Sequence, residues 1–297
     1  MSRLVFIHGI GQQHADPDTL RNAWAAALRE GIRHAGRDFE IRDHDIAMVF
    51  YGDVFKTRGS RGPGTPDLDV DDIEDELERE LLLQWWATAA TADPSVPGPD
   101  AATRLRTPRM LQRALDALSQ SEFFAGIAER ALIFSLRQVR LYLTHQQTRN
   151  RILERAGEAI NDGTRVVVAH SLGTIVAYES LFAQPLSADG ALVTLGSPLG
   201  IRNLIFDRLR PVPVDGQGAW PPSVTRWTNL SDHGDVVALV KELRPLFPFP
   251  LASDLKSSVL TGAGVADGLV HNGAKAHDVR PYLRAAATGR AVADALA

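Results

Sequence analysis

The strongest local signal in the sequence is residues 165–177, which read RVVVAHSLGTIVA. A β-branched apolar run precedes Ser171, and a stretch with helical spacing follows Gly173. A strand that turns at a serine directly into a helix is typical of a nucleophile in a strained backbone conformation, which needs small residues two positions before and after it. Ala169 and Gly173 fill those positions. The N-terminus of the helix would then lie under Ser171, where its dipole favours developing negative charge.

The same stretch has a simpler interpretation, in which a buried strand is followed by a helix with a serine N-cap. The motif alone does not separate the two, because Ala169 stands where the full Gly-x-Ser-x-Gly pattern has glycine. We favour the nucleophile because residues later in the chain supply its partners in the order that the mechanism requires.

Composition narrows the class of protein. With 297 residues, 44% hydrophobic and 23% charged, the chain can bury a sizeable core. A net charge of −4 gives no indication of a nucleic-acid partner, and the absence of cysteine excludes disulfides, a catalytic thiol and thiolate metal sites. We see no signal peptide at the N-terminus and no apolar window long enough to span a membrane, so we expect a cytoplasmic protein.

Apolar runs and helical periodicities alternate along the chain. Strands are predicted at 4–7, 46–51, directly before Ser171, within 190–198 and at 224–230, and helices at 18–35, 149–161 and 279–296. A β-α-β order of this kind predicts an α/β fold with a mostly parallel sheet and right-handed crossovers.

The pattern changes between residues 56 and 149. Breaks rich in Gly and Pro separate a predicted helix at 71–90 from further helix between 109 and 150. We therefore expect an α/β core of residues 1–55 and 150–297, with 56–149 inserted as a helical cap. The cluster Leu81–Trp86 fits core packing better than its alternative, an acyl-chain wall or a lid that contacts a membrane. The proline-rich segment that contains Phe247–Phe249 is expected at a pocket mouth.

A glycine-containing loop, His8–Gln13, follows the first predicted strand. Gly9 and Gly11 would let backbone N–H groups point into a cleft, and the Ile10 N–H is the donor we expect for an oxyanion. A plain glycine turn is an equally good interpretation of the loop alone. No Gly-Lys-Ser/Thr follows, so it is not a phosphate loop.

Residues that could serve as partners of a serine nucleophile follow Ser171 in the chain. A serine hydroxyl needs a base within hydrogen-bonding reach, and a carboxylate must orient that base. The order Ser, Asp, His is met by Ser171, then Asp235 or Asp232, then His277 or His271. We favour Asp235, which follows a glycine, and His277, which directly precedes the terminal helix. Asp232 and His271 are the reserve candidates.

The remaining candidates have supporting functions. Adjacent side chains on a tight turn diverge, so we expect His170 to point away from Ser171 and to pack or hydrogen-bond below it rather than act as base. His8 is expected to stabilise its loop. The Leu172 N–H is the second predicted oxyanion donor. No histidine has His-Glu-x-x-His spacing, so we predict no metal and no cofactor.

With these residues in view, the chain resembles the α/β-hydrolase superfamily, and is most similar to bacterial serine esterases and lipase-like proteins. These combine a His-Gly-Ile-Gly-Gln opening with an Ala/Gly-His-Ser-Leu-Gly-Thr turn, and the matching stretches are 8–12, 166–178, 194–198, 229–237 and 277–283. The resemblance implies Ser171 as nucleophile, Asp235 as acid and His277 as base. It also implies a helix-flanked sheet of about six strands, because the two strands that usually precede the oxyanion-loop strand are lacking.

The sequence therefore predicts a serine carboxylic-ester hydrolase acting on apolar acyl or lipid-like esters through an acyl-enzyme. Acyl transfer or peptide cleavage on the same fold is the alternative. A non-catalytic interaction module is the alternative from another class, because a fold does not by itself confer activity. For the hydrolase, the expected partner is a small-molecule or lipid ester substrate, with no nucleic acid, and any peripheral membrane contact would be made through the cap.

Overall fold

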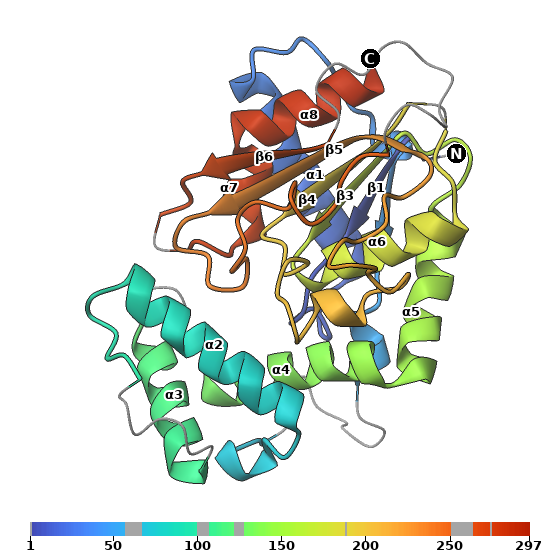
Figure 1. Ribbon diagram of the computed structural model, residues 1–297. Helices are drawn as coiled ribbons and strands as arrows, with labels where there is room; N and C mark the ends of the chain where they lie inside the picture. The colour runs from blue at the N-terminus through green and yellow to red at the C-terminus, as the bar shows by residue number, and fades with distance from the viewer. Residues whose placement is uncertain are drawn as a thin grey trace.

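One parallel sheet forms the centre of the molecule. A computed structural model describes residues 2–56, 67–99, 107–121, 128–187, 189–250, 264–273 and 275–297. In these residues a six-stranded sheet has the order β2-β1-β3-β4-β5-β6, and every neighbouring pair is parallel (Figure 1). The strands are β1 (Leu4–Ile7), β2 (Ile46–Val49), β3 (Val166–His170), β4 (Gly190–Leu195), β5 (Val224–Asp232) and β6 (Val265–Val270). The predicted α/β class and parallel sheet are confirmed.

Helices cover both faces of this sheet. One face carries α1 (Pro17–His34), α7 (Val279–Arg284) and α8 (Ala286–Leu296), and the other carries α5 (Gln146–Ala159) and α6 (Leu172–Ala183). Strand β1 shows the division: Leu4 and Phe6 pack in the first layer, whereas Val5 and Ile7 pack in the second. Successive side chains of a strand point to opposite faces, so a strand covered on both sides must be apolar throughout.

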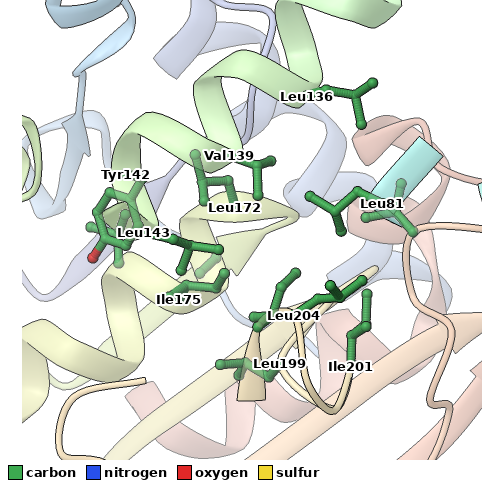
Figure 2. Packing of buried hydrophobic residues seen from close by; sticks show 14 of the residues in the cluster. Leu81, Leu136, Val139, Tyr142, Leu143, Leu172, Ile175, Leu199, Ile201 and Leu204 are labelled. Atoms are coloured by element: carbon green, nitrogen blue, oxygen red, sulfur yellow. The ribbon is translucent and has the colours of Figure 1, made fainter. Parts of the chain in front are cut away.

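A helical insertion lies between β2 and β3 in the chain. It comprises α2 (Glu76–Ala92), α3 (Pro108–Gln120), α4 (Glu129–Thr144) and then α5, and α2 and α3 extend to one side of the sheet (Figure 1). Figure 2 shows how it is fixed: Leu81 of α2 and Val139 of α4 lie near Leu172 and Ile175 of α6 in one buried cluster. Short 3₁₀ segments are η1 (Asp43–Asp45), η2 (Gly52–Phe55), η3 (Val70–Asp72) and η6 (Phe206–Arg208).

The C-terminal helix differs from the prediction, because the expected single helix over 279–296 is two. The break is at Ala285, whose backbone is extended (φ −63°, ψ 134°), and the hydroxyl of Thr288 donates to the carbonyl of Tyr282 across it. A Cβ on Gly31 of α1 would lie 2.2 Å from the Leu283 carbonyl, and one on Gly289 would lie 2.1 Å from Gly31. The break lets both short helices pack closely against α1.

The order of the strands creates a reversal between β1 and β3. From β1 the chain crosses to β2 on one side, and it later returns to β3 on the other side of β1. In open parallel sheets, ligands bind at the carboxyl ends of the strands at such a point. Here those two ends carry the loop around Gly9 and Ser171.

None of the described helices combines the length and the apolar character needed to cross a bilayer.

Candidate active site

Ser171 lies on a strained turn between β3 and α6. Its backbone has φ 55° and ψ −129°, its N–H donates to the Leu195 carbonyl at 3.1 Å, and the residue is 2% exposed. Positive φ is uncommon outside glycine and is held at functional sites by the surrounding structure. Gly173 is needed two positions later, because a Cβ there would lie 2.4 Å from the carbonyl oxygens of Ile7 and His8. The small-residue requirement read from the sequence thus has a direct steric cause.

The loop after β1 runs directly beside this serine. A Cβ on Gly9 would lie 2.7 Å from the Cβ of Ser171, so only glycine fits. Nε2 of His8 accepts the Tyr51 N–H at 3.1 Å, which leaves the proton on Nδ1 to donate to the Gly9 carbonyl at 2.6 Å. Burial lowers the pKa of His8 to about 4, so its ring is neutral near pH 7.

His8 thereby fixes one particular peptide plane. The Gly9 carbonyl and the Ile10 N–H belong to the same trans peptide and point in opposite directions, so holding the carbonyl sets the direction of the N–H. Among the described residues, neither the Ile10 N–H nor the Leu172 N–H has a hydrogen-bond partner. Both predicted oxyanion donors are therefore available to a ligand, although their use by a substrate is still a prediction.

The insertion holds the same loop from its other side. Gly11 donates its N–H to Oε1 of Gln138 on α4 at 3.0 Å, and Nε2 of Gln138 donates to Oε1 of Gln13 at 3.3 Å. Gln138 is 1% exposed. The second glycine of the loop is thus committed to α4 and is not an oxyanion donor in this conformation.

Asp235 is fully buried in the loop after β5 and is surrounded by donors. Its Oδ1 accepts the N–H groups of Val237 (2.9 Å) and Ala238 (3.1 Å). Its Oδ2 accepts hydrogen bonds from Nδ1 of His277 and from the Tyr282 hydroxyl, each at 2.8 Å. All these bonds require an acceptor, so they favour the ionised carboxylate.

The pKa of Asp235 follows from this set of contacts. Burial raises it, but the charge and hydrogen bond of His277, the Tyr282 hydroxyl and the Ala238 N–H outweigh burial and bring it to about 2. The carboxylate is therefore ionised near pH 7, and it holds the proton of His277 on Nδ1. The other ring nitrogen, Nε2, then has the lone pair that a general base needs.

His170 links the turn to the loop that carries His277. Its Nε2–H donates to the His277 carbonyl at 2.9 Å, and the two imidazole rings lie 4.6 Å apart between centroids. Burial and the neighbouring His277 lower the pKa of His170 to about 3, so this ring is neutral too. The contact agrees with a supporting position for His170.

The two reserve candidates occupy other positions. Asp232 accepts the N–H groups of Gly234 (2.7 Å) and Asn272 (2.6 Å), so both its oxygens stabilise turns. His271 is exposed and does not line the cavity described below. The structure pairs Asp235 with His277 and places His277 and Ser171 in the lining of one cavity, and it leaves Asp232 and His271 outside that arrangement.

Ser171 and His277 both line one cavity of about 820 Å³ at the carboxyl ends of β1 and β3. Its walls come from α1, the loop after β1, α2, α4 and the start of α7. A second, much smaller cavity of about 10 Å³ also has Ser171 in its lining, together with apolar residues that include Leu81 and Trp85. Both are buried, as core packing of the Leu81–Trp86 cluster predicts, and they also form part of the site wall.

One predicted pocket contribution is wrong. Phe247 is fully buried against Tyr178 and Trp227, with ring centroids 5.3 and 4.9 Å away, and Phe249 packs on Trp220. None of these aromatic residues lines the cavity at Ser171. The proline-rich segment completes the core next to α6 instead.

Two contributors were not found from the sequence. Tyr282 accepts the Asp232 N–H and donates to Asp235, and so joins α7 to the acid loop. Gln138 lies within a helix whose pattern indicates only packing. No local motif marks either residue, because their partners are more than 40 positions away in the chain.

Within the described residues, no group of three or more His, Asp or Glu side chains could hold a metal ion. Comparison with protein-family models, with curated proteins and with solved structures gave no match.

Proposed function

We propose that this protein is a serine carboxylic-ester hydrolase of the α/β-hydrolase type. The observation that carries the proposal is the Asp235–His277 pair, which lies at the same cavity as a serine with a strained backbone. The chain order Ser171, Asp235, His277 and a parallel sheet whose first strand leads into the glycine loop support the same family.

In the first chemical step, His277 would act as the general base. Nε2 of His277 takes the hydroxyl proton as Oγ of Ser171 attacks the ester carbonyl carbon, and the carbonyl electrons move to the oxygen. The ionised Asp235 stabilises the resulting imidazolium. The oxyanion would be met by the N–H groups of Ile10 and Leu172, each donor being worth about 3 kcal/mol in the barrier.

Collapse of the tetrahedral intermediate re-forms the carbonyl and breaks the bond to the alcohol oxygen. His277 returns its proton to that oxygen, so the alcohol leaves neutral and the acyl group stays on Ser171. Water then attacks the acyl-enzyme with His277 as base again, which releases the carboxylic acid and restores the serine hydroxyl.

The lining of the cavity favours an apolar acyl group. Trp24, Trp85, Leu132 and Phe134 all contribute to its walls. Burial of apolar substrate surface against them contributes roughly 25 cal/mol per Å² before the costs of binding are counted. Acyl or lipid-like esters are therefore the proposed substrates.

Hydrolysis of 4-nitrophenyl butyrate by wild type, Ser171→Ala and Ser135→Ala tests the proposal. Ser135 also lines the cavity, but its hydroxyl donates to the Ala131 carbonyl on α4. We expect Ser171→Ala to lower kcat by about 10⁶-fold and Ser135→Ala to change it little. Equal turnover by wild type and Ser171→Ala would exclude the proposed nucleophile.

A further inference from the structure

We propose that the alcohol part of the substrate carries an anionic group, which Lys275 and Arg280 bind at the mouth of the cavity. The inference rests on the proposed ester hydrolysis, and adds to it the class of alcohol that is released.

The mechanism fixes the side on which the alcohol lies. The group that returns a proton to the leaving oxygen must be beside that oxygen, so the alcohol would face His277. Lys275 and Arg280 flank His277 in the chain, two residues before it and three after it, and all three line the same cavity. The cationic side chains therefore lie on the alcohol side of the ester.

The acyl side has a different lining. Trp85 of α2 and Leu132 and Phe134 of α4 come from the insertion and carry no charge. An ester bound across Ser171 would have its acyl chain against the insertion and its alcohol toward α7. The two ends of one cavity thus differ in chemistry, which is the arrangement expected for an amphiphilic ester.

The charge at the alcohol end is opposite in sign to that of the whole chain. The chain carries a net charge of −4, yet Lys275 and Arg280 meet only one carboxylate, Asp278, in the cavity lining. Oδ1 of Asp278 is occupied as the cap of α7, where it accepts the Arg280 N–H at 2.9 Å. No ion pair joins Lys275 or Arg280 to a carboxylate within the described part of the chain. His14 lines the same mouth.

The expected gain is moderate because both cationic side chains are exposed. Exposed ion pairs contribute up to about 1 kcal/mol each, so we expect each cation to raise kcat/KM for an anionic ester by about three- to fivefold. The gain should shrink at high salt, because mobile ions screen exposed charges.

Four water-soluble esters with a common butyryl group test the inference: those of glycerol, glycerol 3-phosphate, lactate and choline. The first is neutral, the next two carry a phosphate or a carboxylate, and the last is cationic. We would measure kcat/KM for wild type, Lys275→Gln, Arg280→Gln and the double variant. Arg284→Gln is the matched control, because Arg284 is one turn further along α7 and pairs with Glu30 outside the cavity.

The inference predicts that wild type prefers one or both anionic esters over the glycerol ester by about tenfold and disfavours the choline ester. The double variant should lose this preference and keep its activity on the glycerol ester, while Arg284→Gln keeps both. The better anionic ester identifies phosphate or carboxylate as the group recognised. Hydrolysis of all four at similar rates, or a preference that survives in the double variant, would overturn the inference and leave ester hydrolysis standing. Failure to hydrolyse any ester, with no reaction at Ser171, would overturn both.

Discussion

Two buried carboxylates in this protein have similar contacts but very different surroundings. Glu179 on α6 accepts hydrogen bonds from the Tyr142 hydroxyl at 2.7 Å and from Arg149, and Asp235 accepts them from the Tyr282 hydroxyl and from His277. The Arg149 side chain is 2% exposed, whereas that of His277 is 19% exposed and lines the cavity.

The difference lies in what the guanidinium of Arg149 and the imidazole of His277 can do. A guanidinium keeps its proton at any pH that a protein experiences, so the Glu179–Arg149 pair can only fix structure. It joins α5 to α6, and Arg149 also donates to the carbonyls of Leu143 and Arg208. An imidazole can gain and lose a proton. A carboxylate–histidine pair can therefore take part in proton transfer when the second ring nitrogen faces a cavity. Burial of a carboxylate alone therefore does not mark an active site.

The largest expected effect is the loss of activity when Asp235 no longer carries a carboxylate. Asp235→Asn should lower kcat by about 10⁴-fold, because an amide no longer favours the His277 tautomer with its proton on Nδ1. Asp232→Asn should cost far less, since Asp232 accepts only backbone N–H groups of turns. Steady-state kinetics on 4-nitrophenyl butyrate would measure both. A larger loss in Asp232→Asn would exchange the roles of the two residues.

The second effect should appear in stability instead. Glu179→Gln leaves the guanidinium of Arg149 buried without its carboxylate, and we expect a loss of about 3–5 kcal/mol in the free energy of unfolding. Urea denaturation measures this loss, with exposed Glu154 on α5 providing the control Glu154→Gln. Activity per folded molecule should stay near that of wild type. A specific loss of kcat in folded Glu179→Gln would show that the contacts of Glu179 with Arg149 and Tyr142 also serve catalysis.

A third test asks whether the insertion belongs to the active region. Gln138→Leu removes the acceptor for the Gly11 N–H, and we expect kcat to fall by about 10²-fold, as if one oxyanion donor were misplaced, with little change in KM. Gln138→Glu keeps an acceptor and should recover much of the rate. Gln112→Leu on α3 is the control, because Gln112 bonds to Asp116 and Glu129 away from the cavity. Equal kcat in wild type and Gln138→Leu would remove Gln138 from the site.

The smallest effect is a dependence of stability on pH. His8 and His170 have folded-state pKa values of about 4 and about 3, both lowered chiefly by burial from 6.5. Their neutral forms stabilise the fold fully above pH 6.5, and that contribution is lost as the pH falls toward the folded values. Between pH 7 and pH 5 we expect a loss of about 1–2 kcal/mol for each histidine.

Urea denaturation at the two pH values measures this loss. His170→Phe should reduce the difference in stability between pH 7 and pH 5, because position 170 then no longer takes up a proton on unfolding at pH 5. An unchanged pH dependence in His170→Phe would contradict the assignment of the effect to that ring.

Local signals in the sequence were sufficient for much of the fold. Strand β1 was predicted with its observed limits, because four buried apolar residues bounded by a glycine loop have one reasonable interpretation. Strand β6 was not located: its sequence VADGLV contains residues that are poor strand formers, and it is held by pairing with β5. The break at Ala285 was missed for a similar reason, since it follows from close packing on Gly31 of α1.

The candidate site also contains residues that local motifs predict and residues that only long-range contacts identify. Ser171 and the glycine loop have local motifs, and chain order narrowed the acid and the base to two residues each. What separates Asp235 from Asp232, and brings in Tyr282 and Gln138, is contact between distant segments. Such contacts leave no periodic pattern in one sequence, so they could not be predicted from it.

The most direct measurement of the central claim is covalent labelling with a fluorophosphonate, followed by intact mass and peptide mapping. We predict a single adduct on Ser171 in wild type, none in Ser171→Ala, and much slower labelling in His277→Ala. Equal labelling of wild type and Ser171→Ala, or an adduct on another residue, would contradict it.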